Sequence, residues 1–102
     1  MTLLILRLKK EWFEKIKSGE KTHEYRKYDY WYSRIHKAWD RAKANNKDLC
    51  IKFICGYPKK NSVQEFQKSL IVKVEDISVV PGHDTDLKIN ELVVDIKFSV
   101  LY

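Results

Sequence analysis

Three residues of complementary charge lie close together in the first half of the chain. Lys21, Glu24 and Arg26 fall within six residues, just after Gly19. Two cations beside one carboxylate can hold an anion or a polar ligand, because the carboxylate orients the basic groups through charge-assisted hydrogen bonds. Glu24 could instead accept a proton, and a desolvated Lys21 could act as an acid or a base. The same spacing also fits a surface ion-pair cluster, in which each pair contributes only about 0–1 kcal/mol.

A second set of candidate contact residues follows along residues 28–41. Arg34, Lys37 and Arg41 are spaced at i, i+3 and i+7, so on a helix they form one basic stripe. Such a stripe can follow the phosphates of a nucleic acid, although it also fits an ordinary solvated helix face. Tyr28 and Tyr32 are the rings that we expect to be exposed and free to stack on bases.

The distribution of charge and aromatic residues indicates where a nucleic-acid surface would lie. The 102 residues carry a net charge of +6 at pH 7, and residues 1–47 hold 13 Lys or Arg against 6 Asp or Glu. Six of the 13 aromatic residues lie between Tyr25 and Trp39. Cations that meet phosphates and rings that stack on bases are typical of RNA-binding surfaces. The alternatives are a basic protein with a partly aromatic core, or a surface that binds another protein.

Two helices are predicted to flank the charged cluster. Lys9–Ser18 has apolar residues at helical spacing, and its lysine-rich last turn is followed by Gly19, which predicts the end of the helix there. Tyr30–Asn45 is the second predicted helix, and Asp29 is positioned to cap it. The basic stripe lies on this second helix, separate from its apolar face.

A short strand is predicted to carry the cluster itself. In an extended Thr22–Lys27 segment, Glu24 and Arg26 share one face, because strand side chains repeat every two residues. Lys21 would point the other way unless the backbone turns or bulges beside Gly19. We therefore expect a turn at this glycine if the three side chains act together.

The remaining predicted strands decide the fold class. Alternating apolar residues predict them at Leu3–Leu8, Leu49–Cys55, Leu70–Val80 and Leu92–Tyr102. No helix is predicted between the last three strands, so a doubly wound parallel sheet is not expected. The length fits one domain, whose sheet is mixed or antiparallel and curls toward a barrel.

Composition also argues against several classes of protein. Cys50 and Cys55 would lie on opposite faces of a strand, so no disulfide between them is expected. None of the three histidines has zinc-ligand spacing to a cysteine, and we predict no metal and no cofactor. No apolar run approaches the ~18 residues that a membrane-spanning helix needs. The segment Met1–Leu6 is too short for a signal-peptide core, so we expect a cytoplasmic location.

A helix with Trp12, Phe13 and Ile16, followed by Gly-x-Lys-x-x-Glu-x-Arg, resembles the signature of the ASCH domain family, within the PUA-like superfamily. The matching positions are Lys9, Trp12, Phe13, Ile16, Gly19, Lys21, Glu24 and Arg26. The resemblance implies an α+β fold: a small PUA-like β-barrel of about five to six strands with two α-helices. Residues 1–102 would form a single ASCH domain, in which the helix at about 30–45 is an insertion.

The resemblance implies a basic cleft lined by Lys21, Glu24 and Arg26. ASCH domains are associated with RNA binding, so the expected partner is RNA, a nucleotide or a modified nucleoside. In this interpretation Arg34, Lys37, Arg41, Tyr28 and Tyr32 would extend the contact surface.

One branch of the family is similar to amidohydrolases that act on N4-acetylcytidine, and a hydrolase acting on modified nucleosides or on RNA is the alternative function. That branch uses a lysine, a threonine three residues later and a downstream acidic residue. Lys21 matches the lysine, but Glu24 stands at the threonine position. If the protein is an enzyme, we expect Lys21 and Glu24 to be catalytic. The acidic partner is left open among Asp84, Asp86 and Glu91.

Overall fold

The computed structural model describes residues 2–59, 62–64 and 68–101. In chain order the elements are β1 (Thr2–Leu8), α1 (Lys10–Lys17), β2 (His23–Lys27), α2 (Tyr28–Ala44), β3 (Leu49–Cys55), β4 (Ser69–Pro81), the 3-10 helix η1 (Gly82–Asp84) and β5 (Leu92–Val100). These elements agree with the predicted ones to within two residues at most ends. Within the described ranges, neither α-helix has the length and apolar character needed to cross a membrane.

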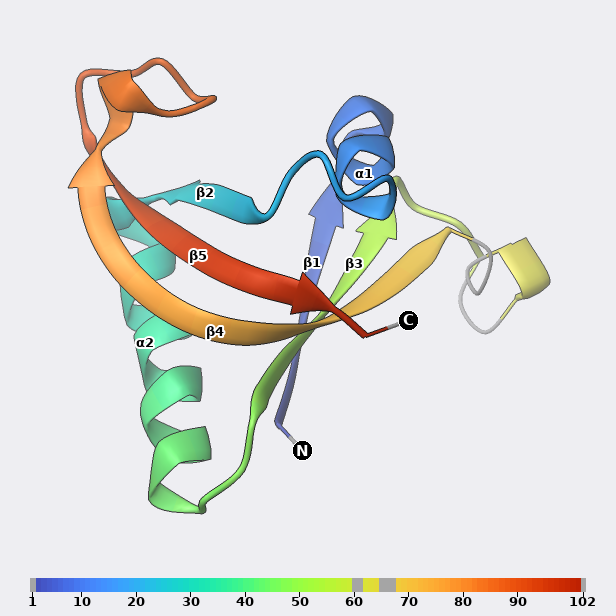
Figure 1. Ribbon diagram of the computed structural model, residues 1–102, viewed down its shortest axis with the longest axis horizontal. Coiled ribbons are helices and arrows are strands. Elements are labelled where there is room, and N and C mark those ends of the chain that lie inside the picture. The colour runs from blue at the N-terminus through green and yellow to red at the C-terminus, as the bar shows by residue number, and fades with distance from the viewer. Residues whose placement is uncertain (1, 60–61, 65–67, 102) are drawn as a thin grey trace.

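The five strands form one curled sheet in the order β1-β3-β4-β5-β2. β1 pairs with β3 in parallel, and the other neighbours pair antiparallel. The long strand β4 bends around the molecule, with a register shift between Val74 and Asp76 where it pairs with β5 (Figure 1). The predicted small α+β fold with a mixed, barrel-like sheet is confirmed. The sheet is a half-barrel, because β1 and β2 remain as its two edges.

Both helices pack an apolar face against the sheet. α1 buries Phe13 and Ile16, as its helical spacing predicts, and Trp12 is only partly buried. α2 buries Ile35 and Ala42, with Trp39 partly buried beside them. Side chains from β1, β3, β4 and β5 complete the core: Leu6, Leu8, Leu49, Ile51, Phe53, Val72, Val74, Val94, Ile96 and Phe98.

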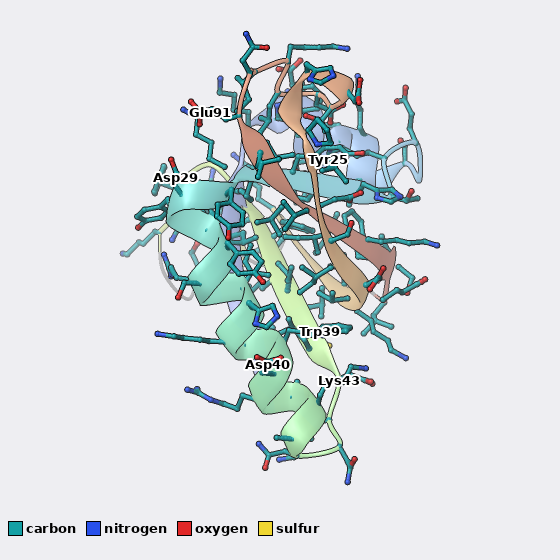
Figure 2. All side chains as sticks on the ribbon, turned by 90° about the vertical axis from the view of Figure 1, so that its left-hand side faces the viewer. Tyr25, Asp29, Trp39, Asp40, Lys43 and Glu91 are labelled. Atoms are coloured by element: carbon teal, nitrogen blue, oxygen red, sulfur yellow. The ribbon has the colours of Figure 1, made fainter. Side chains whose placement is uncertain are left out.

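The start of α2 differs from the prediction. The helix begins at Tyr28, and its N-cap is Lys27, whose side chain makes no capping hydrogen bond. Asp29 is therefore in the first turn and is not the cap. A carboxylate there still stabilises the helix through its dipole. Figure 2 shows Asp29 at this end of α2, with Trp39 and Lys43 nearer the sheet at the other end. Since β2 runs directly into α2, the helix is fixed next to the charged cluster.

Candidate functional site

A cleft of about 290 Å³ opens where the two sheet edges approach each other. Its walls come from the end of β1, from α1, from β2, from the first turn of α2 and from the loop after η1 (Figure 1). The lining residues are Arg7, Leu8, Lys9, Trp12, Lys21, Glu24, Tyr25, Arg26, Lys27, Trp31, Asp86 and Leu87. All three residues of the charged cluster therefore line one concave surface.

The turn predicted beside Gly19 is present, and it brings Lys21 into the cleft. Gly19 has φ of 85°, a left-handed conformation that glycine adopts without steric cost. Its amide donates to the carbonyl of Ile16, and the amide of Lys21 donates to the carbonyl of Lys15. The chain thus folds back over the end of α1 before β2 starts. Lys21 consequently lies on the same side as Glu24, although strand alternation alone would place it on the other.

Glu24 is the buried centre of the site, with only 6% of its surface exposed. Its Oε2 accepts a hydrogen bond of 2.9 Å from Nε of Arg26, and its Oε1 lies 3.8 Å from Nζ of Lys21. Burial raises the pKa of the Glu24 carboxyl above its usual value of 4.5, while the charges of Arg26 and Lys21 act in the opposite direction. The carboxylate holds both basic groups in fixed positions.

Arg26 links the two edges of the sheet. Its Nη2 donates a 2.9 Å hydrogen bond to the carbonyl oxygen of Arg7, at the end of β1. Its guanidinium also lies 4.9 Å from the centre of the Trp31 ring, which forms one wall of the cleft. Arg26 therefore closes the gap between β1 and β2 with a side chain, where no backbone pairing joins them.

Lys21 is surrounded by two rings and two carboxylates. Its Nζ lies 5.3 Å from the centre of the Trp12 ring and 4.9 Å from that of Tyr25. Besides Glu24, Nζ contacts the carboxylate of Asp86. Of the three acidic residues left open by the sequence, Asp86 is thus the one for which a contact with Lys21 is found.

Asp86 is carried by a compact loop between η1 and β5. The amide of Gly82 donates to the carbonyl of Glu91 at 2.8 Å, which closes the base of the loop. Thr85 is buried, and its hydroxyl donates to the carbonyl of Gly82 and accepts from the amide of Leu87. These bonds hold Asp86 and Leu87 over the cleft.

A second depression of about 310 Å³ adjoins the cleft. It shares Trp12, Lys21, Tyr25 and Asp86 with the cleft and continues toward His23, whose Nδ1 lies 2.6 Å from Oδ1 of Asp95. The contact between Lys21 and Asp86 therefore lies between the two depressions. Within the described ranges, no group of three or more His, Cys, Asp or Glu is arranged to hold a metal ion.

The other predicted contact residues lie outside the cleft. Tyr28 and Tyr32 are partly buried and stack on each other, with ring centres 4.7 Å apart. Arg34 is exposed and lies 5.0 Å from the centre of the Trp31 ring, so it reaches the outer side of the cleft wall. Lys37 and Arg41 are exposed further along α2. The structure brings Lys21, Glu24 and Arg26 together in the cleft. The basic stripe lies outside the cleft and continues from its wall along α2.

Several lining residues were not predicted to belong to the site. Trp12 could have been inferred, because adjacent Trp12 and Phe13 cannot both face the core of one helix. Trp31 packs against the core and also forms a wall of the cleft. Arg7 comes from a distant segment and no local pattern marks it, whereas Asp86 was one of three acidic candidates.

The cleft combines positive charge with aromatic walls. Glu24 and Asp86 are its only carboxylates among the described lining residues. They are outnumbered by five basic residues: Arg7, Lys9, Lys21, Arg26 and Lys27. Such a surface attracts anions, and its rings can stack on a planar group. Fold and site together define a small α+β domain with a cleft at the open side of a half-barrel.

Comparison with protein-family models is consistent with this description. The model of the ASCH domain matches residues 6–91. The match covers most of the chain and includes the whole Gly19–Arg26 motif, so the chain belongs to the ASCH domain family. Comparisons with curated proteins and with solved structures found no match.

Proposed function

We propose that this ASCH domain binds a nucleotide or a segment of single-stranded RNA in the cleft. The observation that carries the proposal is the convergence of Lys21, Glu24 and Arg26 on one cleft in which cations outnumber carboxylates. The association of the family with RNA binding supports the same conclusion. A nucleotide offers what this surface recognises, because it combines an anionic phosphate with a planar base.

Each residue of the cluster has a distinct role in this proposal. Lys21 and Arg26 meet phosphate or base oxygens, for which ammonium and guanidinium groups are suited. Glu24 orients both cations, and its carboxylate can accept a hydrogen bond from a base amino group. Trp12 and Trp31 line the cleft and provide rings on which a base can stack.

The basic stripe on α2 indicates the path that a longer RNA would follow out of the cleft. Arg34 contacts Trp31, and the stripe continues along α2 through Lys37 and Arg41. A backbone that leaves the cleft on this side can meet these cations in turn. Tyr28 and Tyr32 stack on each other outside the cleft, so we give them no contact with the nucleotide inside it.

The direct test replaces Lys21 by methionine, which has a similar length and no charge. Lys17 is the last residue of α1, four positions before Lys21, and its side chain is exposed and lines neither depression. Lys17→Met is therefore the matched control. Fluorescence anisotropy with a labelled single-stranded RNA would measure both affinities at one salt concentration. We expect at least a tenfold loss for Lys21→Met and less than a twofold change for Lys17→Met. Equal affinities for the two variants would contradict the proposal.

The contact between Lys21 and Asp86 favours a second candidate, hydrolysis of an acyl amide on a modified cytidine. It pairs the motif lysine with a downstream carboxylate, as in the amidohydrolase branch of the family. In such a reaction water adds to the acyl carbon, the C–N bond breaks and the departing amine takes up a proton. Lys21 and Glu24 would be catalytic, with Asp86 positioning Lys21. Glu24 occupies the place where that branch has a threonine hydroxyl, and the cleft lining contains no serine or threonine among the described residues.

Chromatography of N4-acetylcytidine incubated with the protein distinguishes the two candidates. Release of cytidine by the wild type, lost in Lys21→Met and retained in Lys17→Met, would establish the hydrolase. No release, together with RNA affinity that depends on Lys21, would establish the binding domain.

A further inference from the structure

Arg7 extends the cleft toward a loop that the proposed function does not use. It is the next-to-last residue of β1, and its side chain lines the cleft. Its Nη1 donates a 2.9 Å hydrogen bond to the carbonyl of Gly56, just after β3. Its guanidinium lies 4.6 Å from the centre of the Tyr57 ring. One basic side chain therefore connects the cleft with an aromatic ring outside it.

Tyr57 is an exposed aromatic ring in a constrained position. It is 85% exposed, the highest value among the large hydrophobic residues that are exposed in the described ranges. Gly56 before it turns the chain with φ of 69°, and its amide donates to the carbonyl of Leu8 at 3.1 Å. Pro58 after it restricts the backbone of Tyr57 to extended conformations. The guanidinium of Arg7 lies over the Tyr57 ring. Because Tyr57 is highly exposed, much of its ring surface still faces solvent.

A ring with this environment has the properties of a stacking platform. A cation near one side of the ring limits its motion and adds positive charge for a neighbouring phosphate. A nucleobase can stack on the open ring surface regardless of its sequence, because every base has a π-face. The segment directly after β3 runs to the right in Figure 1, whereas α2 lies to the left, so this platform is separate from the basic stripe.

We propose that the ligand is a single-stranded oligonucleotide of at least two nucleotides, and that Tyr57 and Arg7 form its second subsite. One nucleotide occupies the cleft, the base of its neighbour stacks on Tyr57, and Arg7 contacts the phosphate between them. This inference rests on the proposed function and adds the ligand class: a strand, and not a free nucleotide. A mononucleotide fills only the cleft and gains nothing from Tyr57.

The test compares a mononucleotide with a short strand. Calorimetry at one fixed salt concentration would measure the affinities of uridine 5′-monophosphate and of tetrauridylate for wild type, Tyr57→Ala and Tyr57→Phe. Stacking on an aromatic ring contributes about 1–3 kcal/mol per base, so Tyr57→Ala should weaken tetrauridylate binding about fivefold to a hundredfold. Tyr57→Phe keeps the ring and should retain the wild-type affinity. The affinity for uridine monophosphate should be the same in all three proteins.

The outcomes separate the failure of this inference from the failure of the proposed function. If both ligands bind wild type and Tyr57→Ala changes neither affinity, the inference of a second subsite is wrong, while the proposal that the cleft binds a nucleotide still holds. If Tyr57→Ala weakens both ligands equally, Tyr57 belongs to the first subsite and the inference is also wrong. If neither ligand binds the wild-type protein, both proposals fail together.

Discussion

Lys21 lies between two carboxylates, and the two have different origins. Glu24 follows it in the same motif, whereas Asp86 lies 65 positions later in the loop over the cleft. Asp86 has a side chain that is 36% exposed, against 9% for Glu24, so it is the one that a ligand can displace. In the proposed binding mode, an incoming phosphate competes with Asp86 for Lys21.

This competition predicts the effect of Asp86→Asn. The substitution removes a negative charge beside Lys21 and keeps the shape of the side chain. Unit charges about 4 Å apart in water interact by about 1 kcal/mol, so RNA affinity should rise about fivefold. Anisotropy titrations of wild type and variant at low salt would measure the change. A loss of affinity would show that Asp86 positions Lys21 for the ligand instead of competing with it.

The pH dependence of the free energy of unfolding tests the raised pKa of Glu24. Its pKa in the folded state is raised above 4.5 by burial. Above that pH the unfolded chain loses a proton that the folded protein keeps, so the stability contributed by this group falls as pH rises, until the folded Glu24 also ionises. Glu24→Gln lacks this titration. The free energy of unfolding of wild type, relative to the variant, should therefore decrease as the pH rises above 4.5.

Urea unfolding of the two proteins across this pH range would measure the difference. A wild-type advantage that grows with pH would show that Lys21 and Arg26 lower the pKa of Glu24 by more than burial raises it.

The residues of the site could be predicted only where they are close in sequence. Lys21, Glu24 and Arg26 are within one short motif, where strand alternation predicted a common face for Glu24 and Arg26, and Lys21 was expected to join them only if the chain turned at Gly19. Arg7 reaches the cleft through strand pairing and has no local pattern that marks it, and Asp86 could not be told from Asp84 and Glu91 before its loop was placed over the cleft. Trp31 packs against the core and also lines the cleft. Helical periodicity predicts only that Trp31 is on the apolar face of its helix, and does not show that it also lines the cleft.

The turn between α1 and β2 determines whether the motif can work as a unit. α1 ends where its lysine-rich turn and Gly19 predict, and the positive φ of Gly19 redirects the chain. β2 lacks an apolar period, whereas the extents of α1, β1, β3, β4 and β5 were predictable because their apolar periods are strong. The start of α2 was not, since no sequence pattern shows that β2 leads into it without a connecting loop.

Gly19→Ala should therefore disturb both stability and binding. A Cβ at Gly19 meets no atom within 4 Å, so the cost comes from the left-handed backbone alone, about 1–2 kcal/mol. Thermal or urea unfolding would show this loss, and RNA affinity should fall because Lys21 is displaced. Gly19→Asn is the control, because asparagine tolerates this conformation better than alanine does. Wild-type stability in Gly19→Ala would contradict the role given to the turn.

At the scale of the whole molecule, the fold concentrates positive charge around one opening. The first half of the chain supplies α1, β2 and α2, and the nearly neutral second half supplies the strands that hold them. The strand order β1-β3-β4-β5-β2 creates the opening by leaving β1 and β2 as edges. This order could not be predicted from periodicity, because pairing between distant strands depends on the complete fold.

Salt dependence tests whether the basic stripe takes part in binding. Each phosphate contact with a single strand changes the slope of log affinity against log salt by about 0.7. Replacing Lys37 and Arg41 together by glutamine should thus reduce the slope by about 1.4, while Arg34 stays to keep the wall of the cleft intact. Replacing Lys10 and Lys17, which line neither depression, removes the same charge and should change the slope much less. Equal slopes for the two double variants would exclude a path along α2.

The central claim is that the cleft between the sheet edges is where nucleotide or RNA binds. The three tryptophans provide the most direct measurement, because Trp12 and Trp31 line the cleft while Trp39 packs against the core beneath Lys43. Each indole N–H gives a separate signal in a ¹⁵N–¹H NMR spectrum. On titration with a single-stranded RNA, the signals of Trp12 and Trp31 should shift and that of Trp39 should stay in place. A shift confined to Trp39, or no shift of any indole at saturating RNA, would contradict the account.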